Sequence, residues 1–409
     1  MLAIGAVLLR RPDLMVLAAP LLVIAVWSAW LRPSADPVVT ERLGHDTVRE
    51  GEATTWHIDV RTEGRAEDVG AVLAAPPFST LEPEAGALCT AVDGEDVSLA
   101  LTVRSTRWGR RVIGPARVTA TSAWAAYRFT VPGSPARTLT TLPLPAVFDS
   151  GAPPVHAAGL VGLVRSGRPG DGREFASVRP FQVGDRLRRV HWPRSLRTGT
   201  LHVTSTWSDQ DSHVVIVVDA LNDLGQSGGV DGAASSLDVT VRAAGAIAEH
   251  HLHRGDRVAL HIVGARGVMR VPVATGSSHL RRVLDALASI EPGSDLQDRA
   301  LRHLAIPAEA LVVMLSPLIS PVALQRAYTL ATRGLTVVVV DTLPPGVAED
   351  DPDDPFLGLA WRIRLLERDR ELRRIQQVGI PVVKWRGPGS LDQVLRDLHR
   401  HSSKPRLVR

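Results

Sequence analysis

The C-terminal half of the chain contains short, continuous apolar runs, and these constrain the fold more than any other feature. The first, Val214–Val218, has no polar residue, which is the pattern of a strand buried on both faces of a sheet. Such runs alternate with helical patterns, which predicts an α/β domain with a mostly parallel sheet over residues 211–402. The other strand candidates are 257–263, 311–315, 335–340 and 380–384, and the helical patterns lie near 236–253, 277–290, 321–333, 357–377 and 390–401.

The region before this domain has short alternating segments separated by glycine and proline. Residues 54–60 alternate in part, and residues 97–103 read Val-Ser-Leu-Ala-Leu-Thr-Val. Shorter strand-like pieces follow at 111–113 and 116–120. This spacing predicts an antiparallel β-sandwich over residues 37–148. Because residues 37–148 contain no cluster with metal-ligand spacing and no candidate nucleophile, we expect this region to be a spacer or interaction module.

An uncharged apolar run, Leu14–Leu31, lies near the start of the chain. A helix of this length is about 27 Å long, close to the roughly 30 Å of a bilayer's hydrocarbon core. Trp27 and Trp30 suit the aromatic belt at a membrane interface. We therefore expect residues 1–31 to form a membrane anchor, with one helix at 14–31 or a hairpin that includes 1–9. A signal peptide is less favoured, because no small-x-small cleavage site follows the run.

The orientation of such an anchor depends on how often it crosses the membrane. With one crossing, Arg10 and Arg11 favour a cytoplasmic N-terminus and an external bulk, whereas two crossings put the bulk in the cytoplasm. We expect an integral protein of the cell membrane with cytoplasmic domains. Its partners would then include membrane lipid, which the basic tail 403–409 also favours, and other membrane or envelope proteins.

Composition and charge limit the classes of function. The chain is 44% apolar and 22% charged, which is ordinary for a globular protein. Aromatic residues make up only 4%, and the formal net charge is +4, so we expect no nucleic-acid partner. The single cysteine, Cys89, excludes an internal disulfide framework and a cysteine-based zinc site.

Residues 160–210 form an Arg-rich connector between the two predicted domains. Nine arginines and three acidic residues fall between positions 165 and 202. Arginine offers bidentate geometry to phosphate, so one interpretation is a phosphate site. The other is that Arg188 and Arg197 pair with internal carboxylates while Trp192 packs onto the α/β domain. We expect the second, because no Gly-rich phosphate loop with lysine accompanies the arginines.

The connector carries the pattern E-F-x-x-x-R-x-F-x-x-G-D-x-x-R-x-V-x-W, followed by R-x-G-x-L. This pattern resembles the signature of a bacterial family called domain of unknown function 58. The run R-W-G-R-R-V-I-G-P at 107–115 also resembles that family, whereas His191 stands where the family often has aspartate. The matching positions are Glu174, Phe175, Arg179, Phe181, Gly184, Asp185, Arg188, Val190, Trp192, Arg197, Gly199 and Leu201.

The resemblance implies a function and a fold for the C-terminal domain. It implies a von Willebrand factor A-like domain in a membrane-tethered adaptor or assembly factor that acts with a MoxR-like AAA+ ATPase. Such domains often hold a divalent cation through Asp-x-Ser-x-Ser after the first strand. Here the loop reads Asp219-Ala220-Leu221-Asn222-Asp223, and Leu221 cannot ligate. Asp219 and Asp223 are therefore at most a degenerate site for a hard cation such as Mg²⁺, and we expect no cofactor.

A hydrolase or phosphate-handling enzyme is the alternative, using Asp219, Asp223 and the connector arginines. Open α/β sheets bind ligands at the carboxyl ends of their strands, where Asp219 is expected. No G-x-S-x-G or H-E-x-x-H motif is present in the sequence. The histidines at 250, 251 and 253 fit a solvated helix C-terminus. We therefore expect a protein that is not an enzyme, with Asp219 accepting hydrogen bonds from loop amides.

Overall fold

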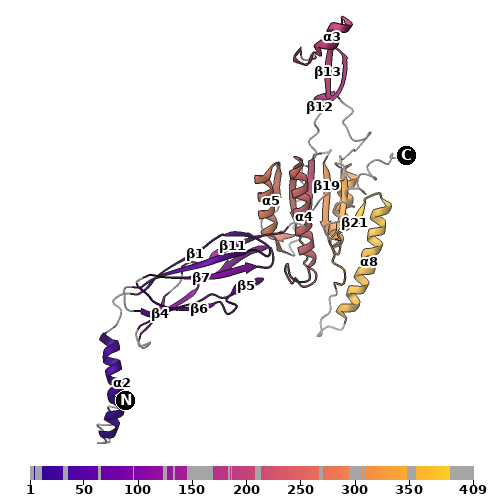
Figure 1. Ribbon diagram of the computed structural model, residues 1–409. Coiled ribbons are helices and arrows are strands. Elements are labelled where there is room, and N and C mark those ends of the chain that lie inside the picture. The colour runs from indigo at the N-terminus through magenta and orange to yellow at the C-terminus, as the bar shows by residue number, and fades with distance from the viewer. Residues whose placement is uncertain are drawn as a thin grey trace. The chain divides into compact units, whose positions relative to one another are not determined.

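The chain divides into two compact units in a computed structural model (Figure 1). One unit comprises Met1–Pro143 and Gly228–Ala233, and the other comprises Leu144–Ser227 and Ala234–Arg409. The structure describes residues 4, 12–30, 36–62, 66–94, 96–122, 127–131, 134–144, 169–182, 185, 187–207, 213–266, 270–293, 306–307, 310–347 and 356–386. The predicted helix at 390–401, the tail 403–409 and nearly all of 1–9 lie outside these residues.

The N-terminal helix α2 spans Pro12–Trp30, close to the predicted boundaries. Among the described residues, however, no helix combines the length and the apolar character needed to cross a membrane. Helix α2 has 19 residues with Asp13 in its first turn and Pro20 inside, so its uncharged part falls short of the roughly 30 Å hydrocarbon core. The predicted anchor over 1–31 and the predicted integral membrane location are therefore wrong. The prediction of cytoplasmic domains depended on that anchor and is not supported.

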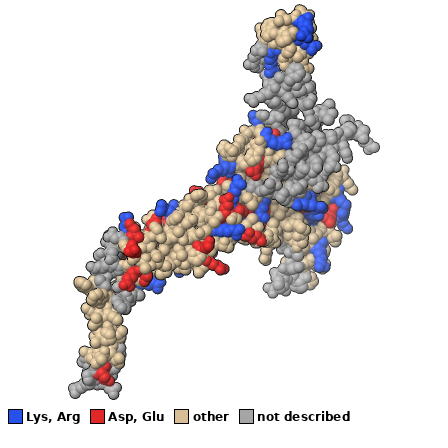
Figure 2. All heavy atoms as spheres, viewed as in Figure 1, with Lys and Arg blue, Asp and Glu red and all other residues tan. Residues whose placement is uncertain are grey.

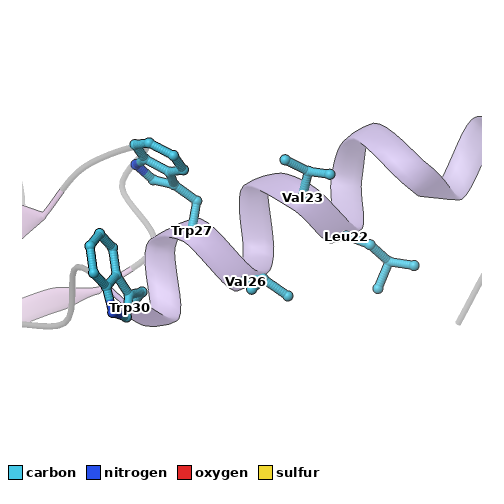
Figure 3. Close-up of a pocket in the computed structure, with 5 residues that line it drawn as sticks. All are labelled: Leu22, Val23, Val26, Trp27 and Trp30. Atoms are coloured by element: carbon cyan, nitrogen blue, oxygen red, sulfur yellow. The ribbon is translucent and has the colours of Figure 1, made fainter.

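The C-terminal half of α2 presents its apolar side chains on the surface. Trp27 and Trp30 meet edge to face, with ring centroids 6.5 Å apart. Figure 3 shows the five side chains that line a shallow apolar pocket beside these rings, which are Leu22, Val23, Val26, Trp27 and Trp30.

The first unit is rich in β-strands, as the alternating pattern predicts. One antiparallel sheet has the order β1 (Val38–Leu43), β3 (Ala53–Arg61), β7 (Asp96–Ser105), β5 (Ser79–Glu82). A second antiparallel sheet has the order β10 (Arg128–Val131), β9 (Arg117–Ser122), β4 (Ala66–Val72), β6 (Ala87–Ala91). A third has the order β2 (Thr47–Arg49), β11 (Arg137–Leu142), β8 (Gly109–Ile113), and its β2–β11 pair is parallel. The unit is therefore not wholly antiparallel.

The core of this unit follows the two-residue period of its strands. In β3, Trp56, Ile58 and Val60 are buried while their neighbours are partly exposed, because alternate side chains point to opposite faces of a sheet. The β7 side chains that pack against them, Val97, Leu99, Leu101 and Val103, alternate in the same way and belong to the same cluster.

A buried carboxylate joins three segments of this unit. Glu41 on β1 is fully buried. Its Oε2 accepts hydrogen bonds from the Trp56 indole Nε1 at 3.0 Å and from the Ala116 backbone nitrogen at 3.2 Å, and its Oε1 accepts from the Ser134 backbone nitrogen at 2.9 Å. Loss of this side chain would leave several buried donors without an acceptor.

The segment Gly228–Ala233 belongs to the first unit although it comes from much later in the chain. The Val230 backbone nitrogen donates to the Thr106 carbonyl oxygen at 2.6 Å. The Arg104 guanidinium pairs with the Asp231 carboxylate at 2.7 Å. The sequence pattern did not predict that this segment belongs to the first unit.

The second unit contains a six-stranded mixed sheet. Its order is β17 (Arg270–Ala274), β15 (Arg257–Val263), β14 (His213–Asp219), β19 (Leu311–Ser316), β20 (Thr336–Asp341), β21 (Val382–Lys384). Neighbouring strands are parallel except β15 and β17, which are antiparallel. Strand β17 was not predicted, because only Val271 of its residues is buried and it therefore lacks a continuous apolar run.

Helices lie where the patterns predict them and cover both faces of the sheet. Val215 and Val217 of β14 pack in one cluster with α7 and α8, and the intervening β14 residues face the side contacted by α4. This explains why the run 214–218 is apolar throughout. The helices are α4 (Ser236–His253), α5 (Ser277–Ala288), α7 (Pro321–Thr332) and α8 (Leu357–Gln377), and a separate pair of short strands is β16 (Ala265–Arg266) and β18 (Glu291–Pro292).

Part of the predicted connector forms a two-stranded element, which we call the arm (residues 169–207). Strand β12 (Pro169–Pro180) pairs with β13 (His202–Trp207) in antiparallel orientation. Between these strands lie the short 3₁₀ helix η2 (Leu187–Arg189) and the helix α3 (Trp192–Thr198). The arm is labelled by β12, β13 and α3 in Figure 1.

Replacement of Glu41 by alanine tests the buried carboxylate. We expect the free energy of unfolding to fall by at least about 3 kcal/mol, since stranded buried donors cost about 1–3 kcal/mol each. Chemical denaturation followed by circular dichroism measures this change. The exposed Glu84 is the matched control, and Glu84→Ala should change stability by less than about 0.5 kcal/mol. Equal effects of the two substitutions would contradict the assignment.

Candidate functional site

Polar side chains meet at the carboxyl edge of the central strands. Asp219 ends β14, Ser316 ends β19 and Asp341 ends β20. After β14 the chain forms β15, which lies beside β14 on one side. It later returns to form β19, which lies beside β14 on the other side. In open α/β sheets, ligands bind outside the strand ends where the order reverses in this way. The ends of β14 and β19 are therefore the natural place for a site, and Asp219 and Ser316 are the residues found there.

The Asp219 carboxylate is used within this edge. Ser316 Oγ donates to its Oδ2 at 2.6 Å, and the Leu221 backbone nitrogen donates to its Oδ1 at 3.1 Å. The side chain is buried. Burial raises the pKa of the Asp219 carboxyl, against the opposing effect of these two hydrogen bonds and of the nearby Arg326 charge. Asp219 therefore accepts a loop amide, as the sequence interpretation expects, and ties β14 to β19.

Ser316 continues the network into the next loop. Its Oγ accepts a hydrogen bond from the Leu318 backbone nitrogen at 2.9 Å. Leu318 is fully buried and has a φ of 59°, in the left-handed region that costs energy for a branched, non-glycine residue. The loop after β19 is therefore held in one conformation by the Asp219–Ser316 pair.

Asp341 faces a guanidinium. The Arg368 side chain, from α8, is 4% exposed, and its Nη2 donates to Asp341 Oδ1. Arg368 Nε also donates to the Pro317 carbonyl oxygen at 2.9 Å, and the Leu343 backbone nitrogen donates to the Asp341 carboxylate at 3.2 Å. One buried arginine therefore neutralises the carboxylate that ends β20 and binds the loop after β19.

A pair of threonines extends this network to α4. Thr342 and Thr240 hydroxyl oxygens are 2.6 Å apart, and Thr240 Oγ1 donates to the Ser236 carbonyl oxygen at 2.7 Å. Ser236 is the first residue of α4 and lies within the capping box formed by Ser235 and Asp238. The polar edge thus joins β20 to the N-terminus of α4.

The two residues predicted as metal ligands do not fit a cation site. Asp223 Oδ1 accepts a hydrogen bond from the Leu237 backbone nitrogen at 3.1 Å, whereas Asp219 accepts from Ser316 and Leu221. Within the described part of the chain, no group of three or more His, Cys, Asp or Glu side chains is placed to hold a metal ion. Mg²⁺ needs several oxygen ligands around one point. These carboxylates instead accept hydrogen bonds from separate loops, while Arg326 is the charge near Asp219 and Arg368 is the charge beside Asp341.

The histidine cluster lies at the other end of α4. His250, His251 and His253 occupy its last turn. His251 is buried, and its Nδ1 is 2.7 Å from Asp256 Oδ2. This hydrogen bond ties the end of the helix to the turn before β15, which is a structural role.

The arm carries the family signature, and the structure explains several of its positions. Arg179 makes a bidentate pair with Asp185, at 2.8 and 2.6 Å, and the Gln182 backbone nitrogen donates to Asp185 Oδ2 at 2.8 Å. The Arg179 guanidinium holds the pKa of the Asp185 carboxyl below its usual value. Arg179 and Asp185 of the signature thus hold together the loop that follows β12. Gly184 and the side chains of Glu174, Phe175 and Arg188 lie outside the described residues.

Two further signature positions cap the helix α3. His191 Nδ1 accepts a hydrogen bond from the Arg194 backbone nitrogen at 3.3 Å, which is what an aspartate does at an N-cap. Gly199 ends the helix with a φ of 72°, and its backbone nitrogen donates to the Ser195 carbonyl oxygen. His191 therefore serves as the N-cap of α3.

The predicted burial of the connector is wrong for Trp192 and Arg197. Trp192 is 60% exposed, and Arg197 is also exposed. Helix α3 has seven residues, and Ser195 is the residue it buries. The Ser195 hydroxyl accepts a hydrogen bond from the His202 backbone nitrogen at 2.9 Å, so α3 packs on β13 through a small polar residue rather than through the tryptophan.

Four apolar side chains of the arm are exposed, which was not predicted. We call these four residues the arm patch, and their exposed fractions lie between 44% and 80%. On the face seen in Figure 2, Lys and Arg atoms gather beside the tan surface at the end of the arm. The residues of the arm patch are Leu187, Trp192, Leu196 and Leu201.

Comparison with known proteins supports the resemblance at the level of the family. Residues 177–349 match the family described as "Protein of unknown function DUF58". An uncharacterized protein of Mycobacterium bovis and one of Mycobacterium tuberculosis are each 27% identical over 186 residues. These matches cover 43% of this chain and 57% of each relative, so the chain spans little more than half the length of the curated relatives it matches.

A solved structure, the cupredoxin domain of amoB from Nitrosocaldus yellowstonii, is also similar over a part of the chain. The match covers 27% of this chain and 88% of that one, with 9% identity and a TM-score of 0.18. At that TM-score the likeness carries no argument about the fold. The matched family region, by contrast, begins within β12 and ends after β20, so it includes the arm patch and the strand-end residues Asp219, Ser316 and Asp341, but not Arg368.

Substitution of Arg368 tests the polar edge. Arg368→Ala would leave the buried Asp341 carboxylate without its counter-charge, and we expect a loss of about 3–5 kcal/mol in the free energy of unfolding. Urea denaturation measures it. Arg370, two residues along α8, is exposed, so Arg370→Ala should cost less than about 0.5 kcal/mol. A mild effect of Arg368→Ala, similar to that of the control, would show that Asp341 does not depend on this arginine.

Proposed function

We propose that this protein is a non-enzymatic adaptor or assembly factor that acts with a MoxR-like AAA+ ATPase. In this proposal the second unit is a von Willebrand factor A-like domain, and the arm patch is the docking surface. The match of residues 177–349 to the DUF58 family supports the proposal, because the resemblance to that family implies an association with such ATPases.

The arm patch is the observation that carries this proposal. Leu187 and Leu196 are 70% and 80% exposed, and Trp192 is 60% exposed. Apolar patches rimmed by polar residues mark sites of protein interaction, and tryptophan and arginine are enriched among the residues that dominate binding energy. Arg194 and Arg197, on the same short helix, are exposed as well. The surface therefore suits a partner with an apolar pocket and an acidic rim.

The mixed sheet supports a von Willebrand factor A-like domain. Its central strand β14 is flanked by β15 and β19, and helices α4 and α7 follow β14 and β19 in the chain. Asp219 at the end of β14 stands where such domains often place their first metal ligand. In this chain the edge is closed by hydrogen bonds and by Arg368, so the proposed domain would bind through its surface and not through an ion.

The hydrolase hypothesis receives less support from the geometry. Asp219 and Asp223 accept hydrogen bonds from different segments, and Arg179 of the connector is paired with Asp185. Each of these three groups is therefore already engaged by a protein partner. A hydrolytic activity that depends on Asp219 would nevertheless favour the enzyme over the adaptor.

Binding of a purified MoxR-like AAA+ ATPase to the immobilised full chain, with ATP present, tests the proposal. We expect Trp192→Ala to raise the dissociation constant at least about tenfold, since truncation of an anchor residue costs about 2 kcal/mol or more. Replacing Arg194 and Arg197 by glutamate should weaken binding further, with a loss that shrinks at high salt. The control is Val112→Ala, at a 66% exposed apolar position on β8.

The controls decide between the two functions. Because Trp192 is exposed, Trp192→Ala should keep the thermal stability of the parent protein, which separates lost binding from lost folding. Binding that Trp192→Ala leaves unchanged would contradict docking on the arm patch. Failure of the intact chain to bind, together with a hydrolytic activity that Asp219→Ala abolishes, would favour the enzyme.

A further inference from the structure

Strand β6 ends its sheet, and its hydrogen bonds to β4 fix which of its backbone groups point outward. The two strands are antiparallel. At one end the Val92 backbone nitrogen donates to the Glu67 carbonyl oxygen at 2.7 Å, and at the other the Leu73 backbone nitrogen donates to the Gly86 carbonyl oxygen at 2.8 Å. Because alternate residues of an antiparallel strand bond to the same neighbour, the even-numbered residues of this segment face β4. The odd-numbered residues therefore face away from it.

The outward backbone groups form a row, which we call the β6 edge (Ala87, Cys89 and Ala91). Each of these residues offers one backbone donor and one backbone acceptor. Within the described part of the chain, no strand pairs with this side of β6. Thr90 Oγ1 is 3.5 Å from the Ala91 carbonyl oxygen, a length at which a hydrogen bond is weak. The side chains of the three residues are exposed, so the row is accessible to a further strand.

The β6 edge lacks the features that usually protect the end of a sheet. Such strands carry a charge or a proline that stops another chain from pairing with them, whereas β6 reads Ala-Leu-Cys-Thr-Ala. Among the described sheets of three or more strands, each of the other end strands contains a charged residue. These strands are β1, β2, β5, β8, β10, β17 and β21.

We propose that the β6 edge binds an extended basic segment of another protein, which adds to the sheet as an antiparallel strand. In this mode of recognition the main-chain hydrogen bonds supply affinity, and alternate side chains supply specificity. The inference rests on the first unit and does not depend on the proposed function of the arm.

Acidic side chains at one end of the β6 edge select a basic partner. Asp68 of β4 lies opposite Ala91 and is exposed, and the exposed Asp93 follows two residues later. A residue of the added strand opposite Ala91 would lie two strand spacings from Asp68, about 10 Å. An arginine side chain covers this distance across the small Ala91. The added strand should therefore carry its positive charge at the Ala91 end.

The arginines of this sheet lie farther from β6. Arg117 is on β9, two strands away and in line with Ala87, and Arg128 is on β10, three strands away and in line with Ala91. Asp68 is on the strand next to β6. The charge closest to the β6 edge is therefore negative.

A second copy of this chain fits the β6 edge less well than a basic segment does. In the register that uses every outward group of both copies, Cys89 of one copy lies opposite Cys89 of the other. Continued beyond the strand, this register puts Asp93 of each copy beside the exposed Glu84 of the other. Like charges in neighbouring positions destabilise a strand pair. The second copy also brings no positive side chain to Asp68.

Binding of a synthetic peptide to the full chain, measured by fluorescence anisotropy, tests the proposal. The peptide acetyl-Arg-Val-Arg-Val-Thr-Val-Thr, with a dye at its C-terminus, would place its second arginine opposite Ala91 and its first threonine opposite Cys89. We expect saturable binding that weakens with salt. Replacing both arginines by glutamate should raise the dissociation constant at least about tenfold. N-methylation of the second arginine and the first threonine should abolish binding, because it removes the donors to the Ala91 and Cys89 carbonyl oxygens.

Variants of the chain test the edge itself. Cys89→Pro removes the central outward N–H and keeps the ladder to β4, because an end strand tolerates proline where its N–H faces solvent. It should raise the dissociation constant at least about tenfold, whereas Cys89→Ala, which keeps that N–H, should bind like the parent. Asp68→Arg should weaken binding of the arginine peptide and strengthen binding of the glutamate peptide. Thermal unfolding checks that each variant is folded.

The outcomes separate a basic segment from the other occupants. Failure of the arginine peptide to bind, equal affinity for the glutamate or N-methylated peptide, or binding that Asp68→Arg leaves unchanged would overturn the proposal. A dimer of the free chain that a bismaleimide cross-links through Cys89, and that excludes the peptide, would overturn it in favour of a second copy. Should Cys89→Pro fail to fold, the N-methylated peptide still decides whether the backbone of the β6 edge is used.

Discussion

The buried contact between Arg368 and Asp341 organises much of the second unit. Through it α8 is bound to the end of β20, and through the Pro317 carbonyl the same guanidinium is bound to the loop after β19. A buried carboxylate without this partner would be strongly destabilising. Arg368 turns one face of α8 to the sheet, and Leu359, Ile363 and Leu366 on the opposite face are exposed.

Much of the second unit follows from local sequence patterns, because each pattern reports burial on a known period. The run 214–218 is apolar throughout, since helices cover both sides of β14, and the helical patterns mark α4, α5, α7 and α8. Strand β17 was missed because it is buried at one position. The membrane anchor was wrongly predicted, since an apolar run of marginal length does not by itself distinguish a spanning helix from other apolar helices.

The candidate site was predictable only in part. The apolar run 214–218 predicts a buried strand, so Asp219 could be placed at the end of that strand. Asp341 likewise follows an apolar run and could be placed at a strand end in the same way. The pairing of Arg368 with Asp341 could not be predicted, because it is a contact between residues far apart in the chain. Nothing in the charged sequence of α8 distinguishes this arginine from its neighbours. In the arm, the roles of His191 and Gly199 follow from helix caps, whereas the exposure of Trp192 depends on Ser195 packing inward.

The central claim is that arginines, Arg368 beside Asp341 and Arg326 near Asp219, balance the carboxylates at the carboxyl edge of the sheet, so that the fold does not depend on a bound metal ion. Thermal unfolding of the full chain in EDTA and then in excess Mg²⁺ tests it most directly, because an ion bound only by the native state raises Tm by mass action. We predict the same Tm in both conditions. A Tm that falls by several degrees in EDTA, recovers with Mg²⁺ and no longer responds in Asp219→Ala would contradict the claim.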